Sequence, residues 1–129
     1  GKKKRRNPSV KTILDIEATI ALFTRQPVCH CFIGKSTPMP GQGVAGIGAY
    51  MKSYGILIGL LSALKIPYTE VAPVTWKKAI MNGMGKEKAM SCLRARQIFP
   101  KLEFPLKKDD GKAEAVLIAE YGRRIITKL

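Results

Sequence analysis

Hydrophobic residues recur with helical spacing along most of the chain and form short apolar runs at two places. The helical spacing predicts a first helix that Ser9 or Thr12 caps and that ends near Arg25, followed by helices over residues 49–64, 76–81, 86–99 and 113–127. The two short runs, residues 28–33 and 67–73, are typical of strands. This order of elements predicts an α/β fold.

The same pattern indicates which residues face a core. In the helix over residues 49–64, Gly55 and Gly59 lie four residues apart, which allows close packing against a neighbouring element. Trp76 stands beside the end of a strand, where a core position is favoured over stacking on a base. The expected inner side of the helix over residues 49–64 holds Tyr50, Tyr54, Leu57, Ile58, Leu61 and Leu64.

Residues 36–48 connect the first strand to the next helix and are rich in glycine and proline. The prolines predict an extended loop, and the glycines allow the backbone of a ligand to come close. The alternative is a surface connector without a binding role.

Only two strands are expected, and a helix-covered sheet of that size is not stable alone. We therefore expect that a partner supplies further strands or that strands precede residue 1, so that the chain is truncated. Residues 10–129 are expected to form one domain. Residues 1–9 form a basic tail, which is either solvated or a phosphate-binding arm.

The charge of the chain changes this picture most. Lysine and arginine number 23 against 9 acidic residues, which gives a net charge of +14. Such an excess favours a polyanionic partner, and nucleic acid leads because the basic residues are spread over several segments rather than along one amphipathic helix. No uninterrupted run of about 18 apolar residues and no secretory signal is present, so neither a membrane partner nor secretion is expected.

The three cysteines are Cys29, Cys31 and Cys92. The first two flank His30, a cluster that would suggest zinc. Alternate residues of a strand point to opposite faces, however, and no second pair of cysteine or histidine residues follows. Reduced thiols in an intracellular or organellar protein are therefore favoured over a metal site.

An acidic motif precedes the last helix: Asp110 and Glu114 are four residues apart, which places both carboxylates on one face of a helix. Close carboxylates repel unless a cation lies between them, and Mg²⁺ is the natural candidate beside a phosphate. The alternative is an acidic first turn that complements the helix dipole, with Asp109 or Asp110 as the cap. The nearby Lys107, Lys108 and Lys112 suit either interpretation.

Several segments, in order, resemble the RuvC-type crossover-junction resolvases, and most closely their phage and organellar branch. The resemblance covers roughly residues 10–125. Its segments are Ile33-Gly34-Lys35-Ser36-Thr37-Pro38-Met39-Pro40-Gly41-Gln42-Gly43, Ser53-Tyr54-Gly55, Val74-Thr75-Trp76-Lys77-Lys78, Phe99-Pro100, Lys107-Lys108-Asp109-Asp110-Gly111-Lys112-Ala113-Glu114-Ala115 and Tyr121-Gly122-Arg123-Arg124.

The resemblance implies an RNase H-like fold, a homodimer and Mg²⁺-dependent cutting of four-way DNA junctions. It also implies four metal ligands. Two correspond to Glu114 and to Asp110, with Asp109 beside it. A glutamate of the family falls at Gly34, and the aspartate of the first strand would lie before Gly1. Because two-metal hydrolysis needs ligands on both sides of the metals, half of the set is expected to bind metal poorly.

Two hypotheses follow. The first is a non-catalytic, resolvase-derived protein that binds nucleic acid, DNA or structured RNA, as a subunit of a large organellar ribonucleoprotein such as a mitochondrial ribosome, with other protein subunits as partners. The second is an active Mg²⁺-dependent junction resolvase, a homodimer that is organellar or cytoplasmic in a bacterium or phage-infected cell. A third interpretation is a basic module that binds a protein. The nucleic-acid-binding candidates are Lys35, Gln42, Gly43, Lys77, Lys78, Lys86, Lys88, Lys107, Lys108, Lys112, Arg123 and Arg124.

Overall fold

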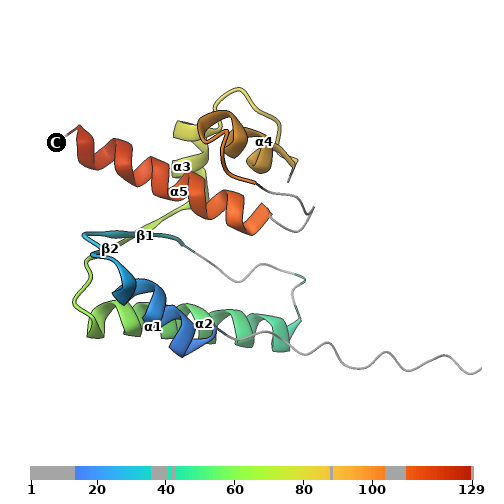
Figure 1. The fold of residues 1–129 in the computed structure, drawn as a ribbon. Coiled ribbons are helices and arrows are strands. Elements are labelled where there is room, and N and C mark those ends of the chain that lie inside the picture. Colours follow the sequence, from blue (N-terminus) through green and yellow to red (C-terminus); the bar gives the residue numbers. More distant parts are fainter. Residues whose placement is uncertain (1–13, 36–40, 42, 88, 104–109, 129) are drawn as a thin grey trace, which may run out of the picture. The chain divides into compact units, whose positions relative to one another are not determined.

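A computed structural model describes residues 14–35, 41, 43–87, 89–103 and 110–128, except for the side chain of residue 110. The elements are α1 (Ile16–Arg25), β1 (Cys31–Gly34), α2 (Val44–Ala63), β2 (Tyr68–Val71), α3 (Pro73–Ile80), α4 (Ala89–Ile98) and α5 (Asp110–Thr127), as Figure 1 shows. Helices and a small parallel sheet confirm the α/β class. The elements fall into two compact units, one with α1 and α2 and the other with β1, β2 and α3 to α5.

The first unit begins with α1, which Asp15 caps. The Asp15 carboxylate accepts a hydrogen bond from the Ala18 backbone N–H at 3.0 Å. The predicted caps, Ser9 and Thr12, lie outside the described residues, and the observed cap stands three residues after Thr12. Just before α1, the Leu14 N–H donates to the Ser53 hydroxyl oxygen at 3.0 Å, which joins this end of α1 to α2.

The next helix, α2, begins at Val44, so the prediction that residues 44–48 belong to the loop is wrong. The Ile47 N–H donates to the Gly43 carbonyl at 3.0 Å, which closes the first turn of the helix. Glycine weakens a helix by only about 1 kcal/mol per residue, a cost that 20 consecutive helical residues can absorb.

The predicted inner face of α2 is largely not buried. Leu61 is its one buried residue, and Tyr50 is 51% exposed. The close packing expected at Gly55 and Gly59 is absent from the described part of the chain, where no heavy atom lies within 4 Å of a Cβ added at either position.

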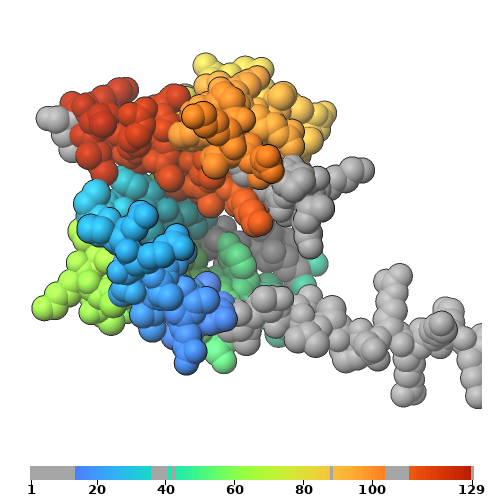
Figure 2. Space-filling model, viewed as in Figure 1, coloured from blue at the N-terminus to red at the C-terminus, as the bar shows by residue number. Residues whose placement is uncertain are grey.

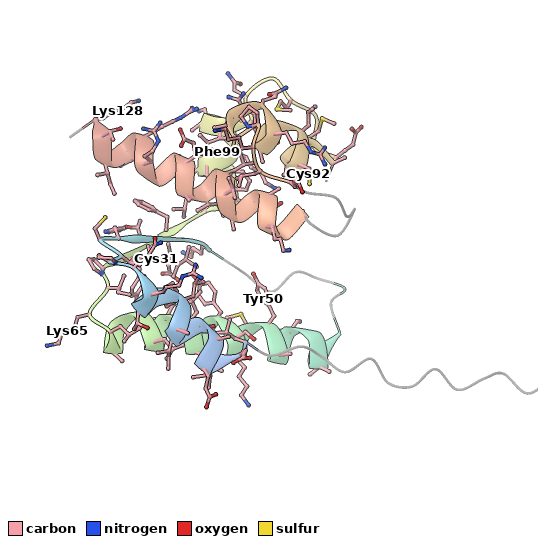
Figure 3. The ribbon with its side chains drawn as sticks, in the orientation of Figure 1. Cys31, Tyr50, Lys65, Cys92, Phe99 and Lys128 are labelled. Atoms are coloured by element: carbon pink, nitrogen blue, oxygen red, sulfur yellow. The ribbon has the colours of Figure 1, made fainter. Side chains whose placement is uncertain are left out.

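A non-glycine residue terminates α2 in a left-handed conformation. Lys65 has φ = 56°, and its N–H donates to the Ser62 carbonyl at 3.1 Å, while the Ile66 N–H donates to the Leu61 carbonyl at 2.9 Å. These two bonds form a Schellman motif, in which glycine is usually found at the position of Lys65. Figure 3 shows Lys65 just beyond the end of α2.

The second unit contains a two-stranded parallel sheet in which Cys31 pairs with Tyr68 and Gly34 with Val71. The ladder is closed at its ends by hydrogen bonds from the Cys31 N–H to the Pro67 carbonyl and from the Lys35 N–H to the Val71 carbonyl. α5 lies across this sheet against β1 (Figure 1). β2 lies within its predicted run, and β1 ends at Gly34, one residue beyond the predicted run 28–33.

The core of the second unit lies where α5 packs against α3 and α4. Trp76 and Ile80 from α3 meet Ala95 from α4 and Leu117 from α5, and each is 2% exposed or less. This confirms that Trp76 is a core residue. Arg94 joins the two shorter helices, because its Nε donates to the Ile80 carbonyl at 2.8 Å. The space-filling view shows α4 and α5 side by side (Figure 2).

α3 begins at Pro73, three residues earlier than predicted. Ala72 occupies the cap position without a side-chain hydrogen bond, and Pro73 occupies the first turn. Proline is favourable there because the N–H it lacks would have had no partner within the helix.

The crossing of α5 over β1 depends on one glycine. A Cβ added to Gly122 would stand 2.5 Å from Cγ of the Phe32 ring, with two other ring carbons closer still. The absence of a side chain at Gly122 therefore lets the Phe32 ring lie directly against the helix backbone.

Candidate functional site

The acidic motif is only partly described. Lys107, Lys108 and Asp109 lie outside the described residues, as does the side chain of Asp110. The backbone of Asp110 is the first residue of α5, so Asp110 and Glu114 are one helical turn apart, as the spacing predicts. Glu114 is half-buried.

Gly34, the last residue of β1, faces α5 one turn beyond Glu114. A Cβ added to Gly34 would stand 3.1 Å from Cδ1 of Ile118, and Ile118 is 8% exposed. The position that the resemblance assigns to a glutamate therefore lies against α5. A side chain at this position would make a tight contact with Ile118, which would have to shift by a few tenths of an ångström.

No group of three or more histidine, cysteine, aspartate or glutamate side chains that could hold a metal ion is present among the described residues. Cys29, Cys31 and Cys92 are all free thiols, and burial raises the pKa of Cys31. Figure 3 shows Cys31 on β1 and Cys92 on α4 well apart, so these two cannot share a ligand.

The described candidates for phosphate contact are mostly exposed. Lys35 follows β1, Lys77 and Lys78 lie in the last turn of α3, and Lys86 lies before α4. All four are exposed, as is Lys112 in the first turn of α5. Gln42 and Lys88 lie outside the described residues, and Gly43 is the cap residue of α2. The Lys77 ammonium lies 5.6 Å from the centre of the Trp76 ring. Trp76 is 2% exposed and therefore presents no free face to a base.

Arg123 and Arg124 are held by a carboxylate that the sequence analysis did not single out. Arg123 donates two hydrogen bonds to Glu120, at 2.7 and 2.9 Å, and Arg124 donates one at 3.0 Å. Glu120 is 5% exposed, while the side chains of Arg123 and Arg124 are 61% and 40% exposed. The spacing of three and four residues on a helix was the signal that could have revealed this cluster.

The electrostatics of this cluster follow from the hydrogen bonds. The pKa of Glu120 is lowered to about 2, mainly by the hydrogen bond from Arg123 and further by Arg124. Burial opposes this change, because it disfavours the charged carboxylate. Glu120 in turn raises the pKa of Arg123. The carboxylate offsets one of two positive charges, so the pair offers a phosphate one net charge rather than two.

A second feature that the sequence analysis missed is a groove of about 570 Å³ in the second unit. Phe32 from β1, Thr69 from β2, Thr75 from α3 and Tyr121 from α5 line it, with His30 just before β1. His30 Nε2 lies 2.8 Å from the Thr69 hydroxyl oxygen, and its ring centre lies 4.7 Å from that of Phe32. No single segment of sequence carries this groove, because its walls come from four elements, β1, β2, α3 and α5.

One observation bears on membranes. Of the described helices, α2 alone is long and apolar enough to cross a bilayer by length and composition, with a mean hydropathy of 1.4 in its most apolar window. Core helices of soluble proteins and signal sequences pass the same test. The absence of a membrane partner therefore stays a prediction.

Comparison with known proteins adds no relative. No protein-family model and no curated protein matches the chain.

Proposed function

We propose that the chain is a resolvase-derived nucleic-acid-binding protein without nuclease activity. The observation that carries the proposal is the net charge of +14, together with the exposure of Lys35, Lys77, Lys78 and Lys86 in the second unit. Lysine side chains bind phosphate as point charges on flexible stems, which suits recognition of shape rather than of sequence.

The lack of cleavage is proposed from the surroundings of Gly34. Hydrolysis with two metal ions needs oxygen ligands on both sides of the ions. Gly34 supplies no oxygen from a side chain, and Ile118 stands 3.1 Å from where its Cβ would be. An apolar group at that position raises the cost of bringing a hydrated Mg²⁺ between β1 and α5.

The active resolvase remains the second candidate because of one observation. Asp110 and Glu114 lie one turn apart at the start of α5, the spacing at which two carboxylates can share Mg²⁺. In that case Mg²⁺ would be the cofactor and a homodimer the working form.

A cleavage assay separates the two candidates. The chain is incubated with a labelled four-way DNA junction and with Mg²⁺ or Mn²⁺, and the products are resolved on a denaturing gel. We expect an intact junction. Cutting at symmetric positions, lost in Glu114→Gln, would overturn the non-catalytic proposal.

Binding is tested by the salt dependence of affinity for the same junction and for a structured RNA. We expect the logarithm of the association constant to fall steeply with the logarithm of salt concentration. Lys77→Gln with Lys78→Gln should reduce the slope by about two, roughly one for each phosphate contact. Lys52→Gln is the control. It also removes one positive charge per substituted residue, at an exposed position of α2, and should leave the slope unchanged. A slope near zero for the unaltered chain would exclude phosphate contacts.

The setting that we propose is a large organellar ribonucleoprotein. The described residues contain a sheet of only two strands, and sheets that stable domains build on are usually larger, so other protein subunits are proposed to cover or extend it. Identification of the RNA and proteins that co-purify with the chain tests this setting. Recovery of the chain free of both RNA and partner proteins would count against it.

A further inference from the structure

The groove in the second unit is lined by residues of β1, β2, α3 and α5, and the proposed function gives it no role. We propose that it binds one unpaired nucleotide of a bound nucleic acid, with the base against Tyr121 and the phosphate near Lys35. This proposal rests on the proposed function, because it assumes that the chain binds nucleic acid.

The size and lining of the groove suit a base. About 570 Å³ lies within the range of small-molecule sites, and the groove is lined by the rings of His30, Phe32 and Tyr121. A base has two apolar faces and a polar edge, so it stacks on aromatic side chains whatever its sequence. The pair His30 and Thr69, 2.8 Å apart, offers polar atoms to such an edge.

The polar groups lie where a sugar-phosphate chain would leave the groove. Lys35 follows the carboxyl end of β1, and Thr75 lies in the first turn of α3, just after the carboxyl end of β2. Because the two strands are parallel, these ends lie at the same edge of the sheet. The ammonium of Lys35 and the hydroxyl of Thr75 can therefore both reach a phosphate attached to the bound nucleoside.

The lining of the groove holds one ammonium, Lys35, and one carboxylate, Glu70, so charge and ring stacking together select its occupant. A second copy of this chain would also carry +14, and repulsion between the copies opposes its docking. A nucleotide supplies both an apolar ring for the rings of the groove and a negative charge for Lys35. An apolar protein segment would satisfy the rings but not the lysine.

The test uses the full chain and a hexamer of thymidine that carries one 2-aminopurine. Fluorescence anisotropy measures affinity, and quenching of 2-aminopurine reports stacking. We expect quenching on binding, and a loss of affinity of about 5- to 150-fold in Tyr121→Leu, the range that follows from loss of one aromatic stacking contact. Tyr121→Phe keeps the ring and should keep the affinity. Lys35→Gln should reduce the salt slope by about one.

A fully paired four-way junction separates this proposal from the proposed function. Because it offers no unpaired base, its affinity should change by less than about twofold in Tyr121→Leu. Suppose that the junction binds with a steep salt dependence, but the hexamer has the same affinity for Tyr121→Leu and for the unaltered chain. The groove proposal is then overturned and the proposed function is not. In that case an apolar protein segment becomes its occupant. If neither probe binds the unaltered chain, the proposed function fails as well.

Discussion

Replacement of Gly122 by alanine is expected to destabilise the second unit. The new Cβ would stand 2.5 Å from Phe32 Cγ and closer to two other ring carbons, whereas carbon atoms in contact prefer about 3.5–4.0 Å. The ring or the helix must therefore move by about 1 Å or more. Overpacking of this kind costs about 1–3 kcal/mol and occasionally more, and overlap with three ring atoms places Gly122→Ala at the upper end.

Part of this cost is offset by the helix itself. Alanine favours a helix over glycine by about 1 kcal/mol, so the net loss in the free energy of unfolding should be about 2 kcal/mol or more. Gly111→Ala on the same helix is the matched control, because no heavy atom of the described residues lies within 4 Å of its added Cβ. It should raise stability by a few tenths to about 1 kcal/mol.

Urea unfolding of both variants, followed by circular dichroism, gives the comparison. A third variant, Phe32→Leu, removes the ring. Its loss of stability should be smaller in the presence of Gly122→Ala than alone, and a double-mutant cycle measures this difference as a coupling energy. If Gly122→Ala were as stable as Gly111→Ala, or if the cycle showed no coupling, the assigned contact between Phe32 and α5 would be wrong.

Two further variants test single features. Lys65→Gly should stabilise the chain by about 0.5–1 kcal/mol, because glycine adopts φ = 56° without the clash of a Cβ. Lys65→Ala keeps a Cβ and should not stabilise it. The midpoint of thermal unfolding measures both variants. Glu120 has a pKa of about 2 in the folded chain, lowered from 4.5, so its contribution to stability is full above about pH 4.5 and is lost as the pH falls toward 2. Glu120→Gln should lower the free energy of unfolding by about 1 kcal/mol at pH 7 and by much less at pH 2, as measured by urea unfolding. An equal loss at both pH values would show that the ion pairs of Glu120 contribute nothing to stability.

The sequence predicted the elements well where local patterns decide them. The runs 28–33 and 67–73 are short, apolar and bracketed by breakers. The second contains β2, and the first contains β1 except for its last residue, Gly34. Helix ends were predicted less well. Asp15 rather than Thr12 begins α1, because several polar residues near that point compete for the cap and only the three-dimensional path selects one.

The candidate site could be predicted only as far as it lies on one helix. The spacing of Asp110 and Glu114 is a local property, and α5 carries it as expected. The contact of Gly34 with Ile118, 84 positions later, joins β1 to α5 and leaves no trace in either segment alone. The groove beside Tyr121 was missed for the same reason, since its walls meet only after the chain has folded.

The arrangement of the second unit also bears on how the chain folds during synthesis. β1 belongs to this unit, yet its partner β2 follows only after the 20 residues of α2, and α5, which lies across β1, begins 76 positions after Gly34. The face of β1 that α5 covers must therefore stay uncovered until α5 has left the ribosome. Contacts so distant in sequence slow folding. A ribosome that pauses before residue 110 would leave Phe32, which packs against Gly122 of α5, exposed to chaperones or to aggregation.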